Sequence, residues 1–470
     1  MIFQVLFDCM DFTGWLLFSF IALLLTDVIR NWRPRSFPPG PWAVPFLGNV
    51  FTGLDFKTME KIYFRLFLRI QRYGPVFSLR RGSERMVFIS GYKMVKEALV
   101  IQLDSFVDRP IVPLFHVVFK GLGISLSNGY LWKKQRKFAN THLRSFGDGR
   151  KSLEKYIEVE NNFLCEAFKE EQGRPFNPQY IITNGVSNII SSVLFGHRFE
   201  YSDQSFRKVL KLDNEAIMLS LSHQQLYDAF PGLLKYLPGP HQTVHNNYKD
   251  IMTFLNMEVQ KHQEEWNPED PRDYIDVYLG EMEKDPQAGF NIETLLVCIL
   301  DLIEAGTETS ATTLRWALLY MIFLTQRNPP VADRPNLPYT DAVIHETQRM
   351  GNIVPMGFPK MASKDATLGE YLIPKVLFDK NEWATPDTFN PEHFLDSEGQ
   401  LCKKDAFLPF SAGKRVCLGE HLARMELFLV FTSLLQHFTF SPVSGEMPSL
   451  DGILGFTHSP QEYRMLAVPR

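Results

Sequence analysis

The sequence predicts a mainly α-helical protein with small β-sheets, an α+β fold in which one long helix crosses the body. Most of the chain beyond residue 50 places apolar residues at helical spacing. Short β-like runs occur at three places, and no internal repeat, low-complexity tract or second linker interrupts the remainder. These observations favour one large domain at residues 51–470. A membrane helix at 1–30 and a basic, proline-rich hinge at 31–50 precede it.

The composition is that of an ordinary globular protein. Of the 470 residues, 45% are apolar and 22% are charged, which is enough for a large core. The net charge of −4 gives no indication of nucleic-acid binding. The five cysteines are scattered, so their spacing predicts neither a disulfide framework nor a zinc cluster, and it favours a reducing compartment.

The N-terminal segment has the features of a membrane anchor. Residues 12–29 are almost wholly apolar, and with the apolar residues 2–7 they approach the roughly 20 needed to cross a bilayer. Arg30, Arg33 and Arg35 follow this segment. Positive charge stays on the cytosolic side, so we expect the body to face the cytosol. A cleaved signal peptide is the alternative, although neither a basic start nor a small-residue cleavage site is evident.

The elements after the anchor follow from local patterns. Four prolines within residues 37–45 predict a stiff, non-helical linker that sets the angle between the body and the membrane. The β-like runs are Val76–Leu79, Met86–Ile89 and Ala366–Ile373. Helical periodicity occurs at Lys57–Arg72, Leu131–Leu143, Leu153–Glu171, Ile251–Glu265 and Leu295–Gln326, and an amphipathic run covers Glu420–Phe440.

The run from Ile292 to Gln326 would be about 50 Å long as one helix, enough to cross the whole body. Asp301 and Glu304 lie inside it and argue against a second membrane span.

The decapeptide FSAGKRVCLG at residues 410–419 points to a metal ligand. A cysteine binds iron as the thiolate, and the backbone N–H groups after Cys417 can stabilise that charge at the start of the next helix. Gly413 and Gly419 permit tight turns and the close approach of a flat ligand. Phe410 can shield the sulfur from water. The alternative is a buried cysteine beside a helix start.

Within the long helix, residues 305–309 read Ala-Gly-Thr-Glu-Thr. Glycine and threonine are poor choices for a buried helix interior, so this cluster predicts a local groove against a flat cofactor. An adjacent acid and alcohol, Glu308 and Thr309, could carry protons inward. The alternative is a small-residue notch for helix packing, with Glu308 in solvent.

Two further motifs involve charged groups. Glu346 and Arg349 can form a helical ion pair, and such a pair needs more hydrogen-bond partners if it is buried, with His393 as the expected third member. Trp132 and Arg136 stand one helical turn apart and present two donors suited to a carboxylate. A basic helix facing solvent is the alternative for the second motif.

Together these motifs resemble those of the cytochrome P-450 superfamily. Residues 410–419 match its haem-binding signature, and five motifs occur in the family's order over essentially the whole chain. The anchor and hinge are similar to those of the microsomal branch. Residues 333–406 are most similar to the vertebrate family-2 group.

The resemblance implies roles for individual residues. The fold would be the cytochrome P-450 fold, with the long helix over haem b (iron protoporphyrin IX). Cys417 would be the axial ligand, and Thr309 and Glu308 would relay protons during oxygen activation. The remaining cofactor-binding residues would be Arg109, Trp132, Arg136, Ala305, Gly306, Lys360, Phe410, Gly413, Arg415 and Gly419. Lys360 stands where close relatives more often have histidine.

The implied activity is monooxygenation at the endoplasmic reticulum membrane. Electrons would come from NADPH through a separate reductase docked on a basic face, with cytochrome b5 as a second candidate partner. Products would be hydroxylated or epoxidised lipophiles, from fatty acids such as polyunsaturated ones or from xenobiotics. The basic face would comprise Lys133, Lys134, Lys137 and Lys414. The pocket would be lined by residues 106–126, Ile303 and Ala305, residues 354–358 and residues 455–457.

The chain departs from the family at two junctions. Relatives carry about twenty more residues, or about 30 Å of helix, between Pro330 and Val331. They also carry a β-strand between Lys375 and Val376, and its loss would leave neighbouring strands with unpaired backbone groups. Two alternatives therefore stay open: an inactive or misfolded variant, and a reductase-independent haem-thiolate isomerase.

Overall fold

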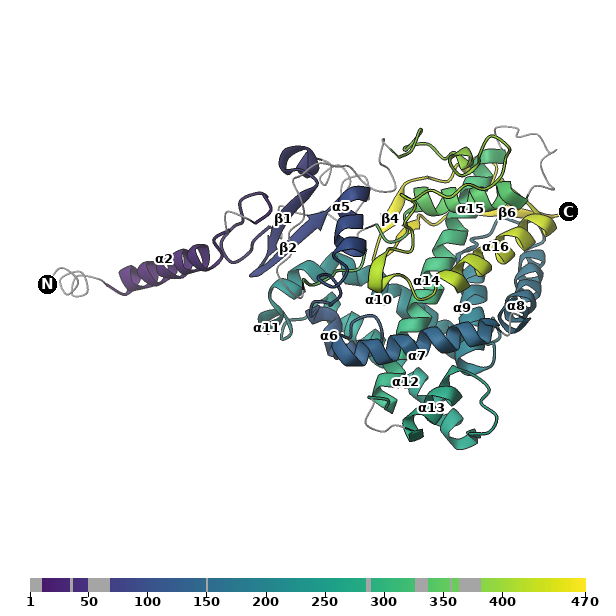
Figure 1. The fold of residues 1–470 in the computed structure, drawn as a ribbon, viewed down its shortest axis with the longest axis horizontal. Helices are drawn as coiled ribbons and strands as arrows, with labels where there is room; N and C mark the ends of the chain where they lie inside the picture. Colours follow the sequence, from purple (N-terminus) through teal and green to yellow (C-terminus); the bar gives the residue numbers. More distant parts are fainter. Residues whose placement is uncertain are drawn as a thin grey trace.

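The computed structural model describes residues 11–33, 37–49, 68–148, 151–284, 289–325, 337–355, 357–362 and 382–470. Within them it confirms a mainly helical fold with small antiparallel sheets (Figure 1). The larger helices are α2 (Phe12–Arg30), α7 (Gly129–Asp148), α8 (Lys151–Glu170), α9 (Gln179–Phe195), α10 (Gln204–Ala229), α12 (Pro240–Glu265), α13 (Tyr274–Lys284), α14 (Ile292–Thr325), α15 (Leu337–Gly351) and α16 (Glu420–His437). Shorter helical segments are α5 (Tyr92–Lys96), η1 (Glu97–Ile101), α6 (Pro113–Phe119), α11 (Pro231–Leu234), η4 (Pro391–Phe394) and η5 (Gly413–Arg415).

Three two-stranded antiparallel sheets complete the described structure. The pairs are β1 (Val76–Arg81) with β2 (Glu84–Ile89), β3 (Phe438–Pro442) with β6 (Met465–Pro469), and β4 (Gly452–Leu454) with β5 (His458–Pro460). The two N-terminal strands confirm the predicted β-like runs. The register pairs Val76 with Ile89 and Arg81 with Glu84, so β1 and β2 form a tight hairpin.

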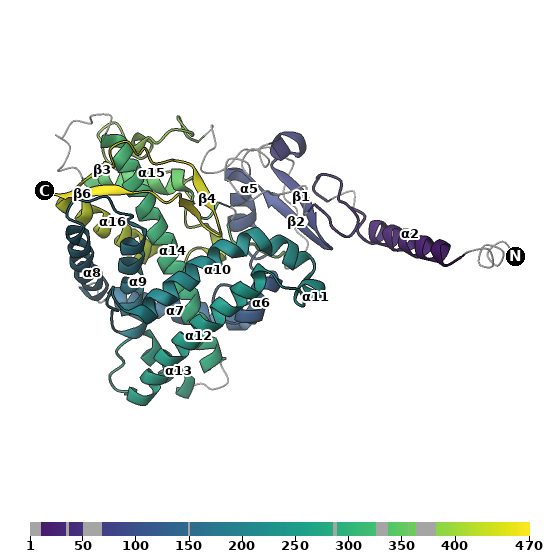
Figure 2. The same cartoon turned by 180° about the vertical axis from the view of Figure 1, so that it is seen from behind.

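Helix α14 joins two hydrophobic cores. Its first half, up to Ile303, packs in a core shared with α7, α9, α10, α12 and α13. Its second half, from Ala311, packs in a core shared with α8, α9, α15, α16, β3 and β6. The helix therefore runs through the middle of the body in both views (Figures 1 and 2). Residues 304–310, which include the Ala-Gly-Thr-Glu-Thr segment, lie between the two cores.

Helix α2 projects away from the body and is not buried at any residue (Figure 1). Its mean hydropathy of 2.0 over a membrane-length window matches the predicted anchor. At its last turn Asp27 accepts two hydrogen bonds from the Arg80 guanidinium in β1, each 3.0 Å long, in an ion pair that is mostly buried. The hinge packs on the same strand, because Ser78 N–H donates to the Pro39 carbonyl at 2.7 Å. The end of the anchor is thus fastened to the body.

The predicted helices at 131–143, 153–171 and 292–326 are confirmed with shifts of up to five residues at their ends. The helix predicted at 251–265 is also present, but it begins eleven residues earlier, at Pro240. Several helices were not predicted. Helix α9 is buried on nearly every side, so it has no amphipathic stripe. The predicted strand at 366–373, most of the predicted helix at 57–72, and the junctions at Pro330 and Lys375 lie outside the described residues.

Candidate functional site

The loop that carries Cys417 is shaped by its backbone. Gly413 has a φ of +76°, and a Cβ there would overlap the carbonyl of Leu99 in η1. Glycine is therefore required at this turn. The Cys417 N–H donates to the Phe410 carbonyl at 2.9 Å, which closes the loop just before α16 begins. The N–H groups of Gly419 and Glu420 point at the sulfur and favour its thiolate form.

Gly419 has a different role from Gly413. Its φ is −86°, so no left-handed turn requires glycine there. A Cβ would instead lie 4.0 Å from the Cys417 sulfur. Beside the loop, the Arg424 guanidinium lies 5.0 Å from the centre of the Phe410 ring. The shielding of the sulfur by that ring stays a prediction.

Cys417 lies deep in the protein yet keeps an exposed surface. Burial raises the pKa of its thiol, opposed by the two N–H groups and by the charge of Arg136. The side chain is nevertheless exposed. Ala305 in the middle of α14 is exposed as well, although both neighbouring halves of that helix are buried. Both observations fit an internal cavity with the sulfur at one side and Ala305 at another.

Four cations gather around this loop: Arg109, Arg136, Lys360 and Arg415. Burial together with the other cations lowers the pKa of Arg109 to about 10, of Arg415 to about 9 and of Lys360 to about 8. Burial also lowers the pKa of Arg136, which donates to the Val416 carbonyl. Repulsion of this kind is relieved by anions. The cluster therefore has the charge of a site for carboxylates.

Trp132 adds a further hydrogen-bond donor to this site for carboxylates. It is buried on α7, one turn before Arg136, and its indole N–H has no hydrogen-bond partner among the described residues. The Arg415 guanidinium stacks on its ring at 3.8 Å. A buried donor without a partner is costly, so an acceptor outside the protein chain is expected there. The cations, the orphaned indole and the cysteine fit a haem with its propionates toward Trp132.

The Ala-Gly-Thr-Glu-Thr segment faces several directions. A Cβ on Gly306 would lie 3.4 Å from Ile190 of α9, and the buried Thr307 hydroxyl is 2.9 Å from that of Ser187 on the same helix. This geometry favours the packing notch for Gly306 and leaves its predicted cofactor contact as a prediction. Thr309 Oγ1 donates to the Ala305 carbonyl at 2.6 Å, on the side where Ala305 is exposed.

Glu308 is only partly exposed and is hydrogen-bonded to protein groups. The alternative that placed its side chain in solvent was therefore wrong on this point. Its Oε1 accepts from Thr312 Oγ1 at 3.0 Å and from Thr457 Oγ1 at 2.7 Å, with Ser459 Oγ at 3.5 Å. Thr457 and Ser459 come from the β4–β5 hairpin, some 150 residues away in sequence. Sequence reasoning missed these hydroxyl groups because nothing local marks them.

Two other carboxyl contacts of α14 were also missed. Asp301 accepts from the Ile124 N–H at 2.6 Å and the Ser125 N–H at 3.0 Å, and so holds the segment before α7. Glu304 is hydrogen-bonded to Asp213 of α10 in a buried acid pair. The sequence contained a signal for these carboxyl contacts, because Asp301, Glu304 and Glu308 occur at helical spacing within an otherwise apolar helix.

The predicted ion pair between Glu346 and Arg349 is confirmed. Arg349 donates to both carboxylate oxygens of Glu346 at 2.7 Å, and both side chains are fully buried. His393 Nδ1 lies 3.3 Å from the same carboxylate, as predicted. Arg349 also donates to the carbonyls of Pro386 and Thr388, which satisfies two more of its donors.

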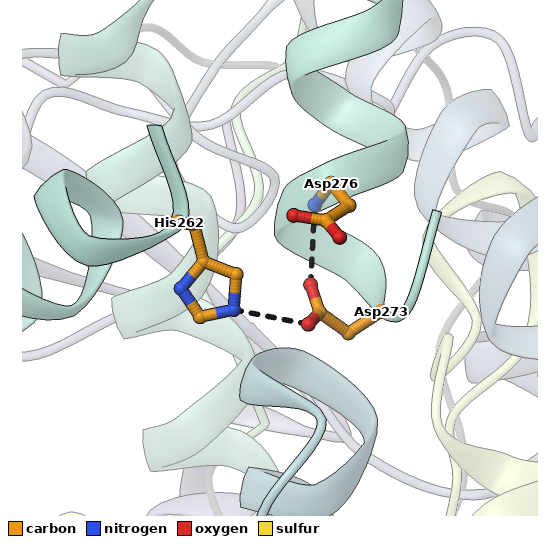
Figure 3. Close-up of side chains that lie close together, drawn as sticks. All are labelled: His262, Asp273 and Asp276. Carbon is orange, nitrogen blue, oxygen red and sulfur yellow. Dashed lines mark hydrogen bonds and ion pairs between the residues drawn. The ribbon is translucent and has the colours of Figure 1, made fainter. Parts of the chain in front are cut away.

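A second cluster, formed by His262, Asp273 and Asp276, has the composition of a metal site but acts as a helix cap (Figure 3). Asp273 accepts from the Asp276 N–H at 3.1 Å at the start of α13, and His262 Nε2 lies 3.0 Å from the other Asp273 oxygen. Arg272 binds both oxygens of Asp276. His262 Nδ1 contacts the Glu258 carbonyl, so both ring nitrogens face acceptors, as in a protonated histidine.

Comparison with known proteins identifies the family of this chain. The profile of the family described as Cytochrome P450 matches residues 38–324 and 322–467. The chain is 46% identical to cytochrome P450 2J2 of Homo sapiens, over 97% of this chain and 96% of the relative. It is 45% identical to cytochrome P450 2J1 of Oryctolagus cuniculus, over 97% and 95%, and 38% identical to cytochrome P450 2H2 of Gallus gallus, over 98% and 100%.

These relatives extend over nearly the full length of both chains. The cofactor that they imply is haem b, with electrons from NADPH through a separate reductase. The chain belongs to the cytochrome P450 family, as a haem-thiolate monooxygenase similar to the vertebrate family-2 members.

Proposed function

We propose that this enzyme hydroxylates or epoxidises lipophilic substrates, fatty acids such as polyunsaturated ones or xenobiotics, with Cys417 as the axial ligand of the haem iron. The observation that carries the proposal is the group of four cations and the orphaned Trp132 indole around an exposed but deeply placed cysteine. Bound haem would supply the activation of dioxygen and the insertion of one oxygen atom, with thiolate donation favouring O–O cleavage.

The chain's own residues would hold the group and supply protons. The residues that would hold the propionates are Trp132, Arg136, Arg109, Arg415 and Lys360. In the part of the chain that the structure describes, none of these cations forms an ion pair and nothing accepts a hydrogen bond from the indole. The N–H groups after Cys417 would keep its sulfur ionised. Thr309 Oγ1 would hold a proton at the exposed side of α14, and Glu308 would replenish it.

An apolar cavity would take the substrate. Ala305 is exposed beside it, and the rings of Phe358 and Phe456 meet edge to face with centroids 5.1 Å apart. The Arg109 guanidinium lies over the Phe358 ring, 4.9 Å from its centre. This contact links the predicted lining segments 354–358 and 455–457 to the cation cluster. Apolar walls with few polar groups suit lipophilic molecules.

The orientation and the partners are part of the same proposal. With α2 in the microsomal membrane and the arginines after it on the cytosolic side, the catalytic body would face the cytosol. Lys133 and Lys137 are exposed on α7, and Lys414 pairs with Asp104 beside the cysteine loop. An acidic reductase would dock there, and cytochrome b5 would use the same basic face.

An inactive form is the second candidate, and one observation favours it. The alignment with the human relative extends over 486 positions, more than the 470 residues of this chain, so the relative carries segments that this chain lacks. The family match also divides in two at residues 322–324, close to the predicted junction at Pro330. Loss of a strand near the haem would weaken the pocket.

The deciding test is a carbon monoxide difference spectrum of the reduced, membrane-bound protein. A Soret band at the long-wavelength thiolate position supports the monooxygenase, and the Cys417→Ser variant must lose it. A short-wavelength band or no haem would support the inactive form, and restoring both segments would then recover the band. Turnover without NADPH would instead identify a haem-thiolate isomerase.

A further inference from the structure

The turn between β4 and β5 reaches across to α14 at Glu308. Thr457 Oγ1 donates to Glu308 Oε1 at 2.7 Å, the shortest of the three hydroxyl contacts of that oxygen. Thr457 is only 1% exposed. A hydroxyl that donates to a carboxylate from a buried position forms a strong, charge-assisted hydrogen bond. The contact therefore holds the side chain of Glu308 in one place.

The turn itself is fixed by contacts on several sides. Within it, the Gly455 N–H donates to the Thr457 carbonyl at 2.9 Å. At its base, the His458 N–H donates to the Ile353 carbonyl at 2.7 Å, and the Trp316 indole of α14 donates to the His458 carbonyl at 3.0 Å. Thr457 is thus anchored to the same helix that carries Glu308, and its hydroxyl can act as a rigid holder.

The acid and the alcohol of α14 are neighbours in sequence and form hydrogen bonds with different partners. Thr309 Oγ1 donates back to the Ala305 carbonyl, toward the exposed side of the helix. Glu308 turns instead toward the hairpin, where Thr312 Oγ1 adds a second hydrogen bond at 3.0 Å. A proton donor of this kind works only when its carboxyl stays within reach of the group that it supplies. Free rotation of Glu308 would spread it over several rotamers.

We propose that Thr457 is a positioning residue for proton supply, because its hydroxyl holds the Glu308 carboxylate in its working orientation. The inference rests on the proposed role of Glu308. Thr312 alone cannot replace this contact, because it lies one helical turn away on the same helix and moves with Glu308. Thr457 fastens the acid to a different element.

Four variants test the assignment. Thr457→Val removes the hydroxyl with little change in shape, and Thr457→Ser restores it. Glu308→Gln is the reference for loss of the acid. Thr294→Val is the matched control, because Thr294 is a fully buried threonine of α14 whose hydroxyl has no hydrogen-bond partner within the described ranges.

The first readout is the coupling of NADPH oxidation to product formation, with hydrogen peroxide measured alongside. Loss of a charge-assisted hydrogen bond reduces the population of the held position about tenfold. In Thr457→Val we therefore expect a fall in product per NADPH of up to about tenfold, with a matching rise in peroxide. The carbon monoxide spectrum should stay unchanged. Thr457→Ser and Thr294→Val should behave like the wild type.

The second readout is independent of turnover. In protein labelled with ¹³C-glutamate, the carboxylate band of Glu308 is assigned by its disappearance in Glu308→Gln. Loss of a donor should shift this infrared band in Thr457→Val and not in Thr457→Ser. If Glu308→Gln uncouples but Thr457→Val neither uncouples nor shifts the band, the positioning role is overturned. If Glu308→Gln itself stays coupled, the proposed role of Glu308 is wrong and the inference falls with it.

Discussion

The buried acid pair between α10 and α14 gives a quantitative prediction. Asp213 is 6% exposed, and its carboxyl is hydrogen-bonded to that of Glu304. Burial raises the pKa of Asp213 to about 7 and that of Glu304 well above its usual value. Among the described residues, no lysine, arginine or histidine forms an ion pair with either group. We therefore expect Asp213→Asn to stabilise the protein at alkaline pH.

The magnitude follows from the pKa difference. The folded protein keeps a proton on Asp213 up to about pH 7, whereas the unfolded chain releases it near 3.8. The folded state binds more protons in that window, so the free energy of unfolding falls as pH rises through it and levels off above 7. One pH unit corresponds to about 1.36 kcal/mol, and the whole difference to about 4 kcal/mol as an upper limit. For a chain of this length that is about 4 °C in Tm.

The assay is thermal unfolding of the full-length protein in detergent micelles at pH 6 and pH 8, followed by circular dichroism. Asp213→Asn should melt above the wild type at pH 8, and the gain should shrink at pH 6. The matched control is Asp250→Asn, which removes an exposed carboxylate paired with Lys208 and should change Tm little at either pH. An Asp213→Asn protein that melts at or below the wild type at pH 8, or a gain independent of pH, would refute the reasoning.

Three other predictions concern buried contacts. Glu346→Gln leaves the Arg349 charge unpaired and should lower the free energy of unfolding by about 3–5 kcal/mol. The thiolate band in the carbon monoxide spectrum should then be lost, and normal haem loading of this variant would contradict the prediction. Burial opposes the charged form of His262, but the hydrogen bond and the charge of Asp273 raise its pKa. The contribution of this ion pair to the free energy of unfolding should therefore be complete below pH 6.5 and fall as pH rises through the raised pKa. Urea unfolding of His262→Gln should lack this decline. Trp132→Phe removes the orphaned indole donor and should speed haem transfer to apomyoglobin by about fivefold, with an unchanged rate as the contrary result.

Local motifs made much of the site predictable. The glycines and the cysteine of residues 410–419 form a local motif, and the long helix has an unmistakable apolar pattern. The close approach of the Leu99 carbonyl to Gly413 is a long-range contact that this motif does not reveal. The partners of Glu308 were not predictable in this way. Thr457 lies on a hairpin at the far end of the chain, and its hydroxyl reaches α14 only through packing of the two cores.

Helix packing also limited the prediction of individual roles. Ile190 of α9 fills the space beside Gly306, which favours a packing role, and the predicted contact of Gly306 with a cofactor stays a prediction. The same helix escaped prediction because it is buried on nearly all sides and carries polar residues such as Asn184 and Asn188 inside the core. Buried polar groups disturb an apolar pattern even where they are fully accommodated, as by the 2.8 Å hydrogen bond from Asn188 to the Phe199 carbonyl.

The ion pair between Asp27 and Arg80 has a consequence for how deep the enzyme sits. It joins the last turn of α2 to the first strand of the body. With α2 in a bilayer, any movement further inward would carry both charges toward hydrocarbon, which costs several kcal/mol. Movement outward would expose the apolar side chains of the helix to water. The pair would thus limit how far α2 can move into or out of the bilayer. It would thereby fix the distance between the substrate cavity and the lipid from which lipophilic molecules would enter.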